Sequence, residues 1–383
     1  MADAAGATPL LPGLPDEIAV WEIFVRLPPK PLLRCRAVSP AWRRATSARA
    51  FLLSHHARQP ALRLLYGRGD LADGGRSLDI VPYDHRAAGA ATAAADRFRP
   101  VARLRTPPYQ EGLPFFTLLL HLEASRDGLL LLSDEVGGLS ICNPATRQYA
   151  PLHQHLHAFG LLELYPHPPT GEHRLLLHRP AQDQRRRVYV STIGSDQPPR
   201  RIGCPDPNGL EHILGLLFQG DIHWYKDSGI TVFDTTDESF RRIRTPVACD
   251  YARLFEMGDM LGIFFFANDE DTTIDIWVMQ DYQGEAWDFV RRVELPVADF
   301  SCQCHSSWHE EGMMVVVPGD DGELVLLVSC DGWLFQVDAD GKLIAAFQTG
   351  DLNSTLYVLK QTLVQHAFFP TLDGYVVNAL PFI

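Results

Sequence analysis

The chain has 383 residues, 46% of them hydrophobic, and a formal net charge of −13. This composition excludes a disordered chain, and the length allows a small N-terminal module plus about 320 residues for one large or two ordinary domains. Residues 14–58 hold eight basic and three acidic side chains, a local charge of +5, so the remainder carries −18. The basic charge of residues 14–58 fits a module that binds an acidic partner. The acidic charge of the rest of the chain argues against nucleic acid as the main ligand of the large domain or domains.

The seven cysteines are odd in number and show no paired C-x-x-C spacing. We therefore expect reduced thiols in a soluble cytoplasmic and/or nuclear protein. Residues 1–12 lack an apolar run of signal length and are expected to be a flexible N-terminus. The longest apolar stretch elsewhere, near Met260 to Ala267, is too short to span a bilayer, so no membrane association is expected.

Residues 14–47 predict three short helices. The first begins at an acidic pair, has apolar residues at helical spacing, and ends before Pro28-Pro29. Pro31 suits the first turn of a second helix, and Ser39-Pro40 reads as the N-cap and first residue of a third. A domain below ~40 residues usually needs a disulfide, a metal or a partner, and the single cysteine here favours the partner.

One ordered set of residues runs through this segment: Leu14-Pro15, Ile18, Glu22-Ile23, Arg26-Leu27-Pro28, Lys30, Leu32-Leu33-Arg34, Arg36, Val38-Ser39 and Trp42-Arg43. In this order and spacing, these residues resemble the F-box. Pro29, Pro31 and Pro40 depart from the family pattern and affect the expected helix boundaries. The resemblance implies an F-box helical domain over residues 13–58 that binds the Skp-type adaptor of a cullin-RING ubiquitin ligase.

The resemblance also implies which side chains contact the adaptor or support those that do: Leu14, Pro15, Ile18, Ile23, Leu27, Pro28, Leu32, Val38 and Trp42. The alternative is a generic three-helix cap packed on the chain's own next domain.

Past residue 60 the pattern changes to short apolar runs closed by Gly, Asp, Asn and Pro, which predicts a mainly β structure. A glycine before an apolar run recurs at positions 128, 220, 258, 332 and 374, at intervals of 92, 38, 74 and 42. Four-stranded propeller blades of ~40 to 50 residues suit this spacing and predict six to eight blades, with seven slightly favoured. An array of β-sandwiches is the competing architecture.

Four strings in this region resemble the F-box-associated domains of plant F-box proteins, at residues 142–147, 220–224, 230–240 and 274–282. The resemblance implies a kelch-like propeller over residues 60–383 that recruits a target protein.

Within these strings, Asn143-Pro144 and residues 234–236 are expected to form turns between strands. Trp224 and Trp277 are expected to be core residues rather than ligand platforms.

Two clusters have metal-ligand chemistry. His153, His155 and His157 would point to one side if the segment were a strand, and a second set combines Cys302, Cys304, His305 and His309. A loop or strand edge explains the first set equally well, and the second lacks the usual separation between ligand pairs. We expect no metal, no cofactor and no catalytic residue.

The function expected from these features is that of a non-catalytic substrate receptor, with the Skp-type adaptor on the helices and an unidentified protein on the propeller. The alternatives are an adaptor-binding regulator without a ubiquitination target, and a propeller enzyme that uses a metal at one of the two clusters.

Overall fold

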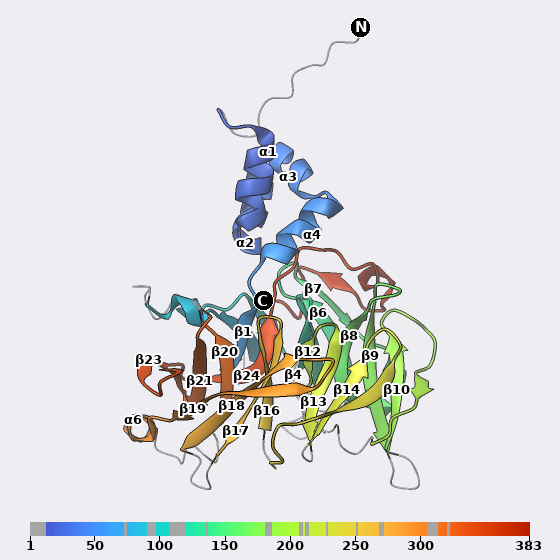
Figure 1. Cartoon of the computed structure of the whole chain (residues 1–383). Helices are drawn as coiled ribbons and strands as arrows, with labels where there is room; N and C mark the ends of the chain where they lie inside the picture. Colours follow the sequence, from blue (N-terminus) through green and yellow to red (C-terminus); the bar gives the residue numbers. More distant parts are fainter. Residues whose placement is uncertain are drawn as a thin grey trace.

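The computed structural model describes residues 13–383 apart from 73–74, 90–96, 107–119, 135–136, 181–185, 207–209, 211–213, 227–228, 250–251, 268–271, 305–312 and 320–321. The expected flexible segment at residues 1–12 lies outside the described residues. Figure 1 shows a small helical region standing on one face of a ring of β-sheets. None of the helices in these described ranges is long and apolar enough to cross a membrane.

The helical region contains the three predicted helices and one more. They are α1 (Asp16–Ile18) continued by η1 (Ala19–Ile23) and η2 (Phe24–Arg26), then α2 (Pro29–Val38), α3 (Pro40–Thr46) and α4 (Arg49–Arg58). The predicted cap of α3 is confirmed, because the Ser39 hydroxyl accepts a hydrogen bond from the Trp42 N–H at 3.3 Å. The sequence patterns did not predict α4.

The rest of the described chain forms six antiparallel sheets, the blades of a six-bladed propeller. Blades 1 to 3 are, in sheet order, β24 (Leu352–Leu359), β1 (Leu62–Asp70), β2 (Arg76–Tyr83) and β3 (Ala102–Arg105); β4 (Leu120–Arg126), β5 (Leu129–Asp134), β6 (Leu139–Asn143), β7 (Gln148–Pro151) and β25 (Val376–Val377); β8 (Gly160–His167), β9 (Glu172–Pro180), β10 (Arg186–Thr192) and β11 (Arg200–Ile202).

Blades 4 to 6 are β12 (Leu216–Phe218), β13 (Asp221–Lys226), β14 (Gly229–Asp234) and β15 (Ser239–Arg244); β16 (Ala252–Met257), β17 (Met260–Phe266), β18 (Thr273–Asp281) and β19 (Ala286–Glu294); β20 (Met313–Pro318), β21 (Leu324–Cys330), β22 (Trp333–Asp338) and β23 (Leu343–Gln348). The short helix α6 (Val297–Ser301) connects blades 5 and 6. The mainly β class is confirmed, and the sandwich alternative is wrong.

The ring closes through the two ends of the propeller sequence. β24, the last long strand, pairs with β1, the first, from Leu62 opposite Leu359 to Gly67 opposite Leu352. The tail then crosses to blade 2, where β25 pairs with β7. Blade 1 therefore takes its strands from both ends of the propeller sequence.

The number of blades lies at the lower end of the predicted range, not at the slightly favoured seven. Gly128, Gly220 and Gly258 occupy the same turn, between the first and second strands of blades 2, 4 and 5. Gly332 instead lies between the second and third strands of blade 6, and Gly374 follows the last blade. The intervals between these glycines therefore compared turns at different places in the blades. They also included the C-terminal tail and the connections between blades, so they gave a wrong blade length.

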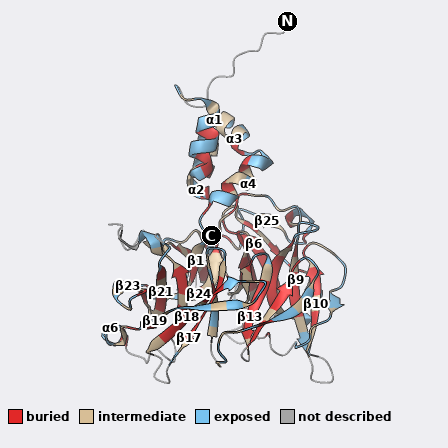
Figure 2. Cartoon of the chain, in the orientation of Figure 1, coloured by how far each residue is buried: buried red, intermediate tan, exposed pale blue. Residues whose placement is uncertain are grey.

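Each blade is buried on both faces by its neighbours, which explains the continuous apolar runs. In β5, Leu129 and Leu131 pack into the core shared with blade 3, whereas Leu130 and Leu132 pack into the core shared with blade 1. The predicted core role of Trp224 is confirmed, since its side chain is fully buried. Figure 2 shows the same burial along the strands of the ring.

The predicted turns are confirmed and belong to a repeated structure. The Asn143 carboxamide oxygen accepts hydrogen bonds from the backbone N–H groups of Ala145 and Thr146. Asp234 makes the equivalent pair of bonds to Thr236 and Asp237. Asp281 and Asp338 also cap the turns after the third strands of blades 5 and 6 with their carboxylates. A side-chain acceptor at this place fixes the turn before the outer strand.

The helical region is fixed to the propeller by the segment that follows β24. Lys360 donates a hydrogen bond from Nζ to the Ala57 carbonyl at 3.2 Å, and His56 Nδ1 lies 3.3 Å from the Gln361 carbonyl oxygen. Leu363 is buried in the core of the helices, beside Phe24 and Phe51. One propeller residue thus completes the helical core.

We expect Leu363→Ala to lower the free energy of unfolding by ~2–5 kcal/mol, because it leaves a cavity at the junction. Urea unfolding followed by tryptophan fluorescence measures the change. Leu53→Ala is the matched control: Leu53 lies on α4 but is exposed, so its truncation should change stability by no more than ~0.5 kcal/mol. Equal effects of the two substitutions would contradict a shared core.

Candidate functional site

The first helix is irregular, and this decides which side chains it exposes. A π-helical turn at Ala19–Ile23 shifts the helical register, so that Val20 and Phe24 point into the helical core. As a result, Trp21 and Ile23 each keep 41% of their surface exposed to solvent. The irregular turn therefore places apolar side chains on both sides of one short helix.

Five large apolar side chains of α1, η1 and α2 are exposed, and we call them the helical apolar surface: Ile18, Trp21, Ile23, Leu33 and Val38. Val38, the last residue of α2, is 78% exposed, the highest value among the large hydrophobic residues that the structure describes. Figure 2 shows exposed segments along α1 and α2, away from the propeller. Such a concentration on the 43-residue region from Asp16 to Arg58 is typical of a surface that another protein covers.

The helices that carry this surface are held by polar contacts. Arg36 donates from Nε to the Thr46 hydroxyl at 2.9 Å and so joins α2 to the end of α3. The Leu27 carbonyl, at the end of η2, lies 2.8 Å from His55 Nε2 and accepts a hydrogen bond from Gln59 Nε2 at 3.2 Å. The unpredicted α4 thus supports the turn between the first two helices and contacts the propeller as well.

The junction also encloses a group of titratable side chains. The rings of His173 and His366 meet edge to face, with centroids 4.9 Å apart, and His173 Nε2 lies 3.6 Å from an Asp127 carboxylate oxygen. Burial lowers the pKa of His366 to about 4; the charges of His173, His56 and Arg49 add to this, while Asp127 opposes it. His366 is therefore neutral in the folded protein at pH 7.

The predicted histidine cluster at residues 153–157 does not form a ligand set. Gln154–Ala158 is a 3-10 helix rather than a strand, so the three imidazoles do not share one side. The rings of His153 and His155 stack with centroids 5.4 Å apart, and His153 Nε2 lies 3.5 Å from Asp196. Within the described ranges, these histidines do not meet the geometry of a metal site.

The predicted cysteine cluster is rearranged. Cys302 is exposed, and His305 and His309 lie outside the described residues. Cys304 instead lies near Cys330, the last residue of β21, and Asp331, which follows that strand. Burial, followed by contact with Cys330 and the charge of Asp331, raises the pKa of the Cys304 thiol to about 12. The sequence did not predict the approach of Cys330, because it lies 26 positions from Cys304 along the chain.

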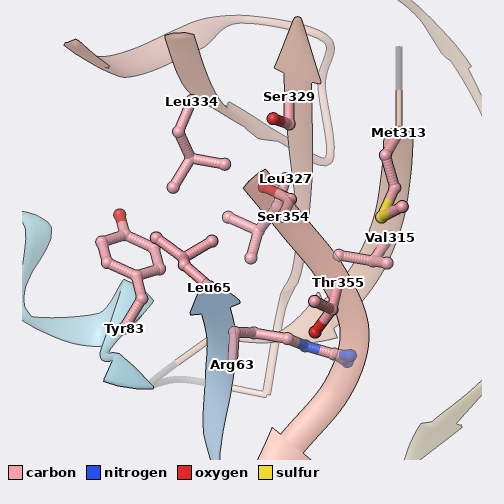
Figure 3. A pocket seen from close by; sticks show the side chains of 10 residues that line it. All are labelled: Arg63, Leu65, Tyr83, Met313, Val315, Leu327, Ser329, Leu334, Ser354 and Thr355. Carbon is pink, nitrogen blue, oxygen red and sulfur yellow. The ribbon is translucent and has the colours of Figure 1, made fainter. Parts of the chain in front are cut away.

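A pocket between blades 1 and 6 is shown in Figure 3. Leu65, Val315 and Leu327 supply apolar walls, and the Arg63 guanidinium donates to the Leu356 carbonyl at 3.1 Å. Burial lowers the pKa of Arg63 to about 10. The interior has room for about one water molecule, far less than a small-molecule site requires.

Comparison with known families decides what kind of protein carries these features. The model described as the F-box associated beta propeller domain matches residues 111–334, more than half of the chain, and the F-box domain model matches residues 11–53. The chain is an F-box protein with an F-box-associated β-propeller.

Individual relatives of this F-box protein are distant. A putative F-box protein of Arabidopsis thaliana is 26% identical over 296 residues, which cover 71% of this chain and 51% of the relative. The chain thus spans about half the length of that curated relative.

Two solved structures are similar to the F-box protein at low TM-scores. A protein of unknown function from Bacteroides caccae is 10% identical, with 76% of this chain and 97% of that chain covered and a TM-score of 0.37. The dihydro-heme d1 dehydrogenase NirN is 16% identical, with 78% and 77% covered and a TM-score of 0.31.

The nine residues predicted to contact or support the adaptor fall into two groups. Pro15, Ile18, Ile23, Pro28 and Val38 are exposed, whereas Leu14, Leu27 and Trp42 are half-buried and Leu32 is fully buried. Leu32 therefore supports the fold rather than lying on the surface. Trp21 and Leu33 were not among the nine predicted residues, although both are exposed. The part of the nine residues in adaptor binding stays a prediction.

The pKa of His366 predicts how the stability of the F-box protein depends on pH. Because the folded pKa of about 4 lies below the ordinary 6.5, the unfolded chain binds more protons between these values. The contribution of His366 to the free energy of unfolding is complete above pH 6.5. It is lost as pH falls toward 4, by at most about 1.4 kcal/mol per pH unit. Urea unfolding of wild type and His366→Gln across this range measures it.

The variant should lose part of the pH dependence, and the exposed His157→Gln should retain the wild-type slope. Some slope should remain in both, since burial also lowers the pKa of His223 to about 4. An unchanged slope in His366→Gln would show that His366 is not buried as a neutral group.

Proposed function

We propose that this protein is the substrate-recognition subunit of an SCF-type (Skp-cullin-F-box) E3 ubiquitin ligase. Residues 13–58 hold the Skp-type adaptor, and the propeller over residues 60–383 holds a target protein. The observation that carries the proposal is the helical apolar surface, exposed on a region that matches the F-box model. Binding an acidic adaptor fits the local charge of +5 in residues 14–58.

The arrangement of the two parts supports a receptor role. The helices stand on one face of the propeller, and α6 lies toward the opposite face (Figure 1). The contacts of Lys360, Gln361 and Leu363 hold the helices without a spacer. A target on the propeller is then kept at a fixed place relative to the adaptor, which raises the effective concentration of its lysines near the charged ubiquitin carrier. The protein itself supplies binding rather than chemistry.

The adaptor surface is best tested by point substitution. Deleting residues 1–58 would uncover Leu363 and the rest of the junction, so a loss of binding would be ambiguous. Ile18 lies in the first turn of α1, where a carboxylate is favoured by the helix dipole. Ile18→Asp therefore preserves the helix but places a buried charge in the complex.

We expect Ile18→Asp to weaken binding of purified Skp-type adaptor at least about tenfold, or about 1.4 kcal/mol, measured by isothermal titration calorimetry. Val290→Asp is the matched control, because Val290 is equally exposed but lies on β19 of the propeller. Its adaptor affinity should match wild type. Wild-type affinity in Ile18→Asp, with an unchanged melting temperature, would contradict the proposed surface.

An adaptor-binding regulator without a ubiquitination target is the main alternative. Quantitative proteomics of cells expressing wild type or Ile18→Asp separates the two functions. A receptor should capture a propeller partner in both cases, and only the wild type should shorten that partner's half-life. If no captured protein changes its half-life or ubiquitination with the wild type, the regulator is favoured.

A further inference from the structure

The connection between blades 5 and 6 meets a turn of blade 6 on the side of the propeller away from the helices. Each of the two segments carries one cysteine there. Cys304 follows α6 between blades 5 and 6, and Cys330 ends β21, immediately before the turn residue Asp331. The two sulfur atoms and a carboxylate oxygen of Asp331 all lie within 4.8 Å of one another. No other trio of this kind occurs in the part of the chain that the structure describes.

The fold holds these three residues from two independent anchors. Phe300 is fully buried and packs against Phe335 with ring centroids 4.8 Å apart, and the Cys304 N–H donates to the Phe300 carbonyl at 2.9 Å. Cys330 pairs with Trp333 across the tight turn. Asp331 adopts a left-handed backbone conformation, with φ of 47°, within that turn. The cluster therefore lies where the connection after blade 5 meets the turn between β21 and β22.

We propose that Cys304, Cys330 and Asp331 form a binding site for a thiophilic divalent cation, Zn²⁺ in the first place. Tetrahedral zinc with bonds of about 2.0–2.3 Å places its ligand atoms ~3.3–3.8 Å apart. The three ligand atoms lie within 4.8 Å of one another, so a contraction of no more than about 1.5 Å brings them to this spacing.

The ligand set defines the character of the site. On binding, both thiols release their protons to solvent, and two thiolates and one carboxylate hold the cation. Three protein ligands leave one tetrahedral position for water or for a group from a bound protein. The site joins the connection after blade 5 to the central hairpin of blade 6, so an occupied site would fix this side of the propeller. The inference goes beyond adaptor binding and does not depend on it.

The test uses the full-length reduced protein, stripped of metal with a chelator. Zn²⁺ alone should bind with a stoichiometry of one per chain, measured by competition with a chromophoric chelator. Co²⁺ alone should give the intense near-ultraviolet absorption of cobalt bound to thiolates. That signal reports directly on sulfur ligands, whereas binding at surface histidines or carboxylates does not produce it.

Three variants assign the ligands. Cys330→Ser should abolish the cobalt–thiolate signal or halve its intensity, and should lower Zn²⁺ affinity by more than the ~10- to 100-fold typical of outer-sphere changes. Asp331→Asn preserves the turn, because asparagine tolerates the left-handed region, and should weaken Zn²⁺ binding at least about tenfold. Cys302→Ser is the control, since Cys302 is exposed and should leave both signals unchanged.

Asp331→Asn keeps the test decisive if Cys330→Ser fails to fold. The proposal is overturned if the wild type gives no cobalt–thiolate absorption, or if Asp331→Asn binds Zn²⁺ as tightly as wild type. It is also overturned if Cys302→Ser removes the signal. None of these results bears on adaptor binding, so the two proposals stand or fall separately.

Discussion

The pairing of β24 with β1 is the constraint on which the rest of the molecule depends. It joins residues nearly 300 positions apart, Leu62 and Leu359, and completes the ring with a blade made from both ends of the propeller sequence. Because every blade is buried against two neighbours, an open ring would expose two apolar faces to water. The segment that follows β24 is also the segment that contacts the helices. Closure of the ring and placement of the helical region are therefore one structural event.

This coupling changes how the helical region should be regarded. A bundle of this size has too small a core to be stable alone, and Leu363 supplies part of what is missing. The propeller stabilises the inner side of the helices and leaves their outer side apolar. Contacts with the propeller hold the helices that carry this surface, and a surface held in place loses less conformational entropy on binding than a tethered module. The outer surface can then be specialised for binding.

The side of the ring away from the helices is organised by contacts between connecting segments and turns. There, connections between blades approach turns within blades, and side chains distant in sequence become neighbours. Cys304 and Cys330 illustrate this, since 26 positions separate them while their sulfur atoms share one cluster. The sequence reveals the cysteines and their soft-metal chemistry, but a linear pattern pairs Cys304 with Cys302 instead. The approach of the connection after α6 to the turn between β21 and β22 decides which of the two cysteines lies beside Cys304.

The sequence by itself determined the F-box and propeller families, the mainly β class, the cap at Ser39 and the turns at Asn143 and Asp234, because these depend on local chemistry and residue order. The acidic residues Asp281 and Asp338 offered a further marker of the repeat, one per blade at the same turn. Tertiary structure alone decided the count of six blades, the role of α4 and the exposure of Trp21. Each of these depends on contacts between distant segments or on a π-helical register shift, and neither is encoded in a short sequence window.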